Sequence, residues 1–101
     1  MTALDAWSAS RTAGAPEALR GRVMEWLGGV KGGAGGADGL ASAGLTALNA
    51  ATGRSGDRSV ALDLLAADAL VTLALLHQAE HDPTGLESFA RRVRMTGAER
   101  E

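Results

Sequence analysis

The stretch that decides the fold is SVALDLLAADALVTLALLHQAEH, residues 59–81, which is rich in leucine and alanine. When its residues are placed about 100° apart, large apolar side chains fall on opposite sides of the helix axis. They are Leu62, Leu64, Val71, Leu73, Leu75 and Leu76. A helix that is apolar all round is buried on several sides by its neighbours. We therefore predict one long central helix over about residues 59–81, packed by the other helices.

The composition fits one small helical domain. The chain has 101 residues, no cysteine and a net charge of -2, and it lacks isoleucine and tyrosine. Its length matches a single domain, and the scarcity of β-favouring residues argues against a sheet. Without cysteine there is neither a disulfide framework nor a thiolate metal site. We predict that residues 1–101 form a single all-α domain.

Further helices are predicted from capping residues and from apolar residues three or four positions apart. A short helix runs over residues 2–11, and the main ones cover residues 16–27, 39–52 and 84–95. Residues 28–39 include seven glycines, which is typical of a flexible connector. The predicted architecture is a bundle of four main helices plus a short N-terminal helix.

Capping residues set the expected helix ends. Asp38 is predicted to cap the third helix, and Asp57 or Ser59 to cap the long one. Thr84 and Glu87, three residues apart, form a predicted capping box at the start of the last helix. The predicted core includes Trp26, Leu48, Leu65, Leu73 and Phe89.

Two histidines end the long helix. His77 and His81 are four residues apart and share one helical face, so their imidazoles could bind one metal ion, with Asp82 or Glu87 as a third ligand. The string His77–His81 resembles the H-x-x-E-H motif of inverzincin peptidases. Those enzymes need a far larger chain and a distant third ligand, so we reject a peptidase and keep a plain divalent-metal site as the hypothesis. The alternative is a polar, exposed helix end.

Two aspartates interrupt the apolar helix. Asp63 is expected in the first turn, where the helix dipole favours a negative charge. Asp68 lies in mid-helix among leucines, and a buried carboxylate must be paired or protonated. We therefore predict that Asp68 forms a structural ion pair or faces solvent in a notch, with a ligand-binding or acid–base carboxylate as the functional alternative. The arginines that could reach it are Arg20, Arg22, Arg91 and Arg92.

A small basic cluster is predicted in the last turn of the final helix. It consists of Arg91, Arg92 and Arg94, and it could contact a nucleic-acid backbone. No aromatic platform for stacking bases accompanies the cluster and the net charge is negative, so binding of nucleic acid is not favoured.

The ends of the chain and its hydropathy predict a cytoplasmic protein. Residues 1–15 have no secretory pattern, and the apolar stretch 60–76 carries two aspartates, which a membrane span disfavours. Abundant alanine, glycine and arginine indicate a GC-rich bacterial genome. We expect the cell interior and no membrane partner.

The residues favour a non-catalytic protein. There is no cysteine, and the serines lie in predicted caps and loops without a nucleophile motif, so an enzyme is disfavoured. Helical packing explains nearly every residue, so we predict association with another protein or self-association as an isologous dimer through the long or the second helix. The alternatives are a metal- or ligand-binding bundle using His77 and His81, and a small nucleic-acid-binding regulator. No cofactor is expected apart from that candidate divalent metal.

Overall fold

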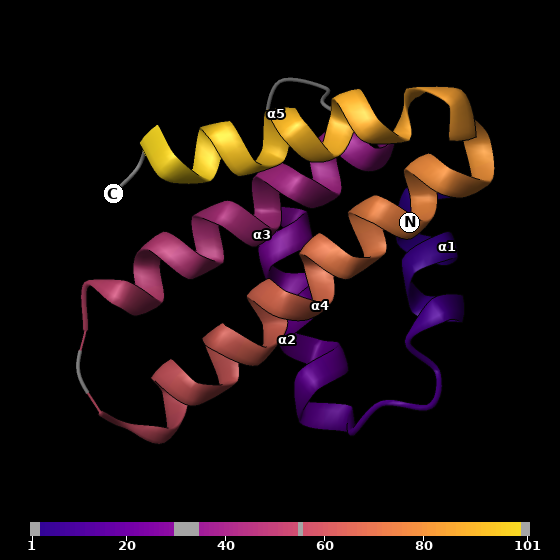
Figure 1. Cartoon of the computed structure of the whole chain (residues 1–101). Coiled ribbons are helices and arrows are strands. Elements are labelled where there is room, and N and C mark those ends of the chain that lie inside the picture. Colours follow the sequence, from indigo (N-terminus) through magenta and orange to yellow (C-terminus); the bar gives the residue numbers. More distant parts are fainter. Residues whose placement is uncertain (1–2, 30–34, 55, 100–101) are drawn as a thin grey trace.

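The protein is an all-α bundle, as predicted, in a computed structural model that describes residues 3–29, 35–54 and 56–99, the last three without side chains. These ranges contain no strand. The helices in chain order are α1 (Ala3–Arg11), α2 (Glu17–Gly28), α3 (Gly36–Thr52), α4 (Arg58–His81) and α5 (Leu86–Glu99), with a 3-10 turn, η1 (Pro83–Gly85), before α5 (Figure 1).

The longest helix, α4, is continuous and organises the bundle. Figure 1 shows α4 crossing the molecule diagonally, with α3 running back along it, α2 behind it and α5 near its C-terminal half. Gly44 of α3 lies against Leu70 and Val71 of α4, so close that an added Cβ would come within 2.9 Å of a Val71 methyl carbon. Glycine therefore permits the close approach of these two helices.

The core lies on one side of α4. Its largest fully buried apolar side chains are Phe89, Leu40, Leu70 and Val23, and Leu73 is also buried, so the predictions for Phe89 and Leu73 are confirmed. Trp26, the third predicted core residue, is only partly buried. Its indole N–H donates a hydrogen bond to the carboxylate of Asp63.

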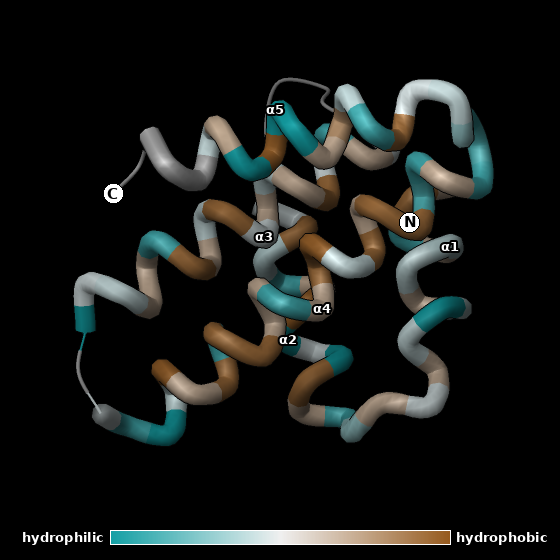
Figure 2. Tube along the Cα trace, in the orientation of Figure 1, coloured by the Kyte–Doolittle hydropathy of each residue, from teal (hydrophilic) through white to brown (hydrophobic). Residues whose placement is uncertain are grey.

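Two core predictions are wrong. Leu65 is 55% exposed and Leu48 is 38% exposed. The reason is that α2, α3 and α5 pack against one side of α4 and leave the other side uncovered, although apolar residues continue along the whole helix (Figure 2). For the same reason, the expectation that other helices cover α4 on all sides is wrong.

The third helix starts earlier than predicted. It begins at Gly36, so Asp38 lies in its first turn instead of capping it, and the N-cap position is Gly35. There the negative charge of Asp38 still favours the positive end of the helix dipole. The predicted connector over 28–39 is correspondingly shorter, because Gly28 belongs to α2 and residues 36–39 to α3; residues 30–34 of it lie outside the described residues.

The ends of α4 match the prediction more closely. The backbone N–H of Val60 donates to Asp57 Oδ1 at 2.9 Å, so Asp57 is the N-cap. The helix ends at His81, immediately before Asp82 and Pro83.

The predicted capping box of α5 is wrong. Thr84 lies in η1 and its hydroxyl donates to Asp82 Oδ1 at 2.9 Å, whereas Glu87 accepts from Arg91 at 3.0 Å. The nearby carboxylate of Asp82 competes with the capping box for the Thr84 hydroxyl. The 3-10 turn begins at Pro83, because proline suits the first position of a helical turn. Because α5 continues to Glu99, the predicted basic cluster lies in mid-helix and not in the last turn.

Candidate functional site

The main candidate site is the uncovered side of α4. Exposed residues recur on this helix three or four positions apart, which places them in one stripe. We define the α4 face by these residues: Ala61, Leu64, Leu65, Asp68, Thr72 and Leu76.

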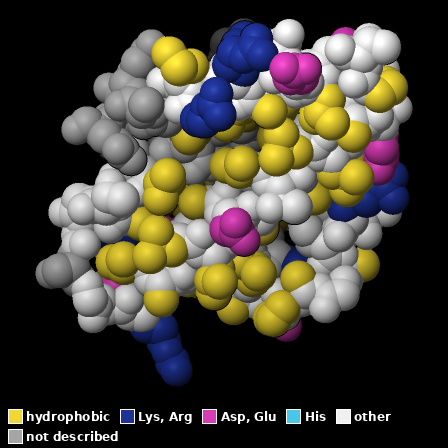
Figure 3. Space-filling view, in the orientation of Figure 1, with side chains coloured by type: hydrophobic (Ala, Val, Ile, Leu, Met, Phe, Trp, Pro, Cys, Tyr) yellow, Lys and Arg dark blue, Asp and Glu magenta, His cyan; other side chains and the backbone are white. Residues whose placement is uncertain are grey.

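The α4 face is mostly apolar. Leu64 is 44% exposed, Leu65 is 55% exposed and Leu76 is 39% exposed. Figure 3 shows hydrophobic side chains gathered over this side of the molecule, with an acidic side chain among them. Large contiguous apolar surface is uncommon on monomers and marks binding sites. The face is therefore suited to contact another apolar surface.

An apolar groove continues from one end of this face. It lies between the C-terminal half of α4, η1 and α5, and its apolar lining is Leu75, Leu76, Ala79, Pro83, Leu86 and Ala90. Leu76 belongs both to the groove and to the α4 face. The two features thus form one continuous surface.

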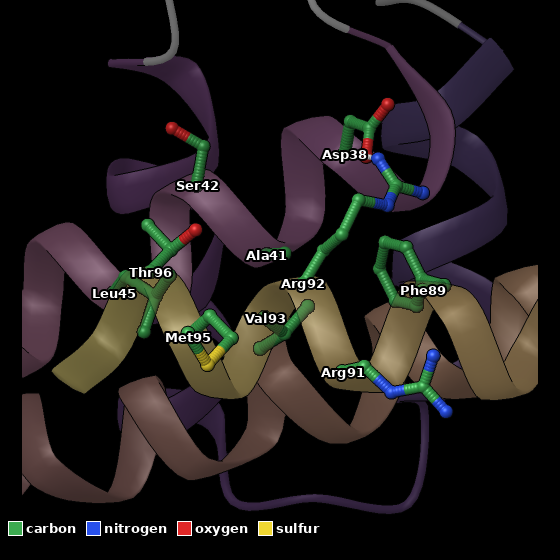
Figure 4. Close-up of a pocket in the computed structure, with 10 residues that line it drawn as sticks. All are labelled: Asp38, Ala41, Ser42, Leu45, Phe89, Arg91, Arg92, Val93, Met95 and Thr96. Atoms are coloured by element: carbon green, nitrogen blue, oxygen red, sulfur yellow. Dashed lines mark ion pairs between the residues drawn. The ribbon is translucent and has the colours of Figure 1, made fainter. Parts of the chain in front are cut away.

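A second hollow lies between α3 and α5, away from the α4 face (Figure 4). Its floor includes Ala41, Leu45 and Phe89, and Arg92 crosses its rim toward Asp38, with Nη1 3.7 Å from Oδ1. Its lining residues include the hydroxyls of Ser42 and Thr96 and no histidine. Its chemistry is that of an apolar depression with a charged rim.

The buried carboxylate of this protein is Asp63. It is 1% exposed and lies in the second turn of α4. Its Oδ1 accepts from Trp26 Nε1 at 2.9 Å and from Arg22 Nη1 at 3.0 Å, while Oδ2 accepts from Arg54. This cluster ties α2 and the α3–α4 turn to α4.

Its neighbours keep the Asp63 carboxylate charged. Burial by itself raises the pKa of Asp63, but the hydrogen bonds from Trp26 and Arg54 and the charges of Arg22 and Arg54 outweigh it and lower the pKa. Both of its oxygens accept hydrogen bonds from protein donors. The cluster therefore acts as a structural clamp.

The prediction that Asp68 forms a buried ion pair is wrong, and the structure agrees with the alternative of a solvent-facing side chain. Asp68 is exposed and belongs to the α4 face, and no ion pair reaches it within the described residues. Of the arginines expected to reach it, Arg22 binds Asp63 instead. The sequence does contain a signal for the contact with Asp63. Arg22 and Trp26, the two donors from α2, are four residues apart and therefore share one face of that helix.

The two histidines stack on each other. The rings of His77 and His81 are 3.9 Å apart between centroids and only 11° from parallel, and Trp7 of α1 meets the His77 ring edge-on at 4.8 Å. His81 Nδ1 donates to the backbone carbonyl of His77 at 2.9 Å. Stacked rings present their faces to each other, and the nitrogens do not converge on one point between them.

The expected third ligands are engaged elsewhere. Asp82 accepts from Thr84, and Glu87 binds Arg91 at 3.0 Å. Among the described residues, no group of three or more His, Asp or Glu side chains is placed to hold a metal ion. The structure thus brings His77 and His81 together without Asp82 or Glu87.

The histidine stack belongs to the contact between α1 and α4. Glu80 accepts from Trp7 Nε1 at 3.3 Å and from Arg11 at 2.7 Å. Burial and the neighbouring charge of His81 lower the pKa of His77, although Glu80 acts in the opposite direction. The neutral form of His77 therefore fits this contact best.

The basic cluster is partly neutralised. Arg91 pairs with Glu87 at 3.0 Å and Arg92 lies near Asp38 at 3.7 Å, whereas Arg94 has no ion pair within the described part of the chain. A single arginine without an ion pair among the described residues of α5 makes a weak phosphate-binding surface.

By length and composition, α4 could cross a membrane. Central helices of water-soluble proteins meet the same criterion, and this helix carries the buried Asp63 clamp.

Comparisons with protein-family models, curated proteins and solved structures found no match. Inferences about function therefore rest on the residues and geometry described above.

Proposed function

We propose that this protein is a non-catalytic helical module that works by protein–protein association through the α4 face. The observation that carries the proposal is the exposure of Leu64, Leu65 and Leu76 on one continuous helix. Surfaces of this kind dock against a complementary helix or groove. The module is proposed to act in the cytoplasm without a membrane partner.

The rigidity of α4 supports this proposal. The Asp63 clamp and the close packing at Gly44 hold the helix in place before any partner arrives. Association then loses little additional chain entropy, which is the main advantage of a pre-ordered surface.

The expected affinity is modest. Burying the exposed half of a leucine contributes roughly 1 kcal/mol, whereas association loses about 4–15 kcal/mol of translational and rotational freedom. A few half-exposed leucines therefore support a weak complex unless further contacts add to it. This magnitude favours a reversible association over a permanent one.

The other candidate functions have less support. Among the described residues, the stacked rings of His77 and His81 have no third ligand nearby, and two of the three arginines on α5 already face carboxylates. Metal binding and nucleic-acid binding are therefore secondary hypotheses.

Site-specific photo-crosslinking tests the proposed function. A crosslinking amino acid replaces Leu65 in one variant and Met95 in the other, because these side chains are equally exposed, at 55% and 56%, on different surfaces. In cells, position 65 is expected to give a discrete crosslinked product and position 95 much less. Equal products at both positions, or no product at position 65, would contradict association through the α4 face.

A further inference from the structure

Resting on the proposed function, we propose that a second copy of this chain covers the N-terminal part of the α4 face, with the two α4 helices antiparallel over residues 58–68 and Arg58 of each copy beside Asp68 of the other. The proposal identifies both the partner and the register of the contact.

Two unpaired charges lie along the exposed side of α4. Arg58 and Asp68 are both exposed, and neither forms an ion pair within the described residues. They are ten residues apart on one helix, about 15 Å along its axis, which is too far for them to pair with each other. Both charges are therefore available to a partner.

The helical positions of these charges match the apolar stripe. At about 100° per residue, Arg58 lies at one edge of the stripe and Asp68 near its middle. Leu64 and Leu65, the most exposed leucines of the described residues, lie between them along the helix. Any helix that covers these leucines also meets the two charges.

Only one arrangement of two identical helices pairs both charges with opposite ones. A parallel, in-register pair places Asp68 against Asp68 and Arg58 against Arg58, and like charges repel. An antiparallel pair centred on Asp68 also places Asp68 against the partner's Asp68. An antiparallel pair with its two-fold axis level with residue 63 places each Arg58 opposite the partner's Asp68, and symmetry makes the contact twice.

The same register suits the apolar residues. With the axis level with residue 63, Ala61 of one copy lies opposite the partner's Leu65, so a small side chain faces a large one. Alternating small and large residues is how packed helices interdigitate. Leu48 of α3 is also exposed and is level with the N-terminal half of α4, because it lies one turn beyond Gly44, which lies beside Leu70.

Charge reversal tests the register. Arg58→Asp leaves two acidic residues on each face and Asp68→Arg leaves two basic ones, so each variant alone should dimerise at least about tenfold more weakly than the wild type at low salt. Mixed in equal amounts, the two variants present opposite charges at both contacts, and they should form a heterodimer about as tightly as the wild type dimerises. The double variant should also recover self-association.

The measurement is sedimentation equilibrium up to about 1 mM protein, the range expected for a weak complex, with Leu65→Glu as an additional variant. If the mixture associates no better than either single variant while Leu65→Glu is monomeric, the proposed register is overturned, although dimerisation still uses the α4 face. If Leu65→Glu dimerises like the wild type, the proposed function is overturned as well. A wild type that stays monomeric overturns the second copy as partner, and crosslinking at position 65 then decides the proposed function separately.

Discussion

Replacing Asp63 with asparagine preserves the shape of the side chain and removes the charge that holds the α2–α4 contact. In the native protein this carboxylate is buried and accepts from Trp26, Arg22 and Arg54. The amide oxygen of Asp63→Asn can still accept from Trp26 and Arg22. Its NH2 group, however, faces the Arg54 guanidinium, so two donors oppose each other and Arg54 loses its counter-charge, while Arg22 keeps only the Glu25 carboxylate at 3.8 Å.

The expected loss of stability follows from the burial of each partner. Removing one member of a buried ion pair typically costs about 3–5 kcal/mol. The side chains of Arg22 and Arg54 are 27% and 43% exposed, so both can turn toward water when the charge is gone. We therefore expect Asp63→Asn to lower the free energy of unfolding by about 2–3 kcal/mol, a large part of the roughly 5–15 kcal/mol of a small domain.

Urea unfolding followed by circular dichroism measures this loss, with Glu87→Gln as the control. The control removes an exposed pair with Arg91, so it should change stability by at most about 0.5 kcal/mol. Because folding lowers the pKa of Asp63, its stabilisation is complete above the unfolded pKa of about 3.9 and is lost as the pH falls through the lower folded value. The difference between wild type and Asp63→Asn should therefore shrink below about pH 4. A loss no larger than that of the control at pH 7, or a difference that stays constant down to pH 3, would refute the clamp.

Three further outcomes are expected. Gly44→Ala should destabilise the protein by about 1–3 kcal/mol, because its methyl group would meet Val71 and Leu70. Gly21→Ala, with open space around it, should instead stabilise α2 by about 0.5–1 kcal/mol, and thermal melts of both variants measure the two changes. Asp57→Ala should lower the free energy of unfolding by about 1 kcal/mol through loss of the α4 N-cap; no change in urea unfolding would argue against the cap. Zinc titration by calorimetry should give the same weak binding for the wild type and for a His77→Ala/His81→Ala variant, because no third ligand lies beside the stacked rings among the described residues. Site-specific binding lost in that variant would restore the metal hypothesis.

The length and the ends of α4 could be predicted because local chemistry determines them. Asp57 supplies an N-cap, and Asp82 followed by Pro83 stops the helix. The apolar residues between them favour one continuous helix. These signals act within a few residues and need no knowledge of the other helices.

Which side of α4 is covered could not be predicted in the same way. A helix that is apolar all round has no preferred direction, so its sequence does not separate Leu73, which is buried, from Leu65, which is exposed. The two aspartates are equally ambiguous. The positions of Arg22 and Trp26 on α2 decide that Asp63 is the buried one.

The start of α5 shows a second limit of local patterns. Thr84 and Glu87 have the spacing of a capping box, but the Asp82 carboxylate accepts the Thr84 hydroxyl and a 3-10 turn takes that place. Several local hydrogen bonds of similar strength compete there, and the tertiary contacts select one of them. For the same reason, the local pattern predicts the basic cluster in the last turn of the helix, whereas α5 extends beyond the cluster to Glu99.

The most direct test of self-association through α4 is the distance between spin labels on the two copies. Because the chain has no cysteine, Thr72→Cys and Leu76→Cys each place one label on the exposed side of α4. The antiparallel pairing predicts separations along the helix of about 27 Å for residue 72 and about 39 Å for residue 76, an increase of about 3 Å per residue. Equal distances at the two positions, or no dipolar coupling between labels at high protein concentration, would contradict it.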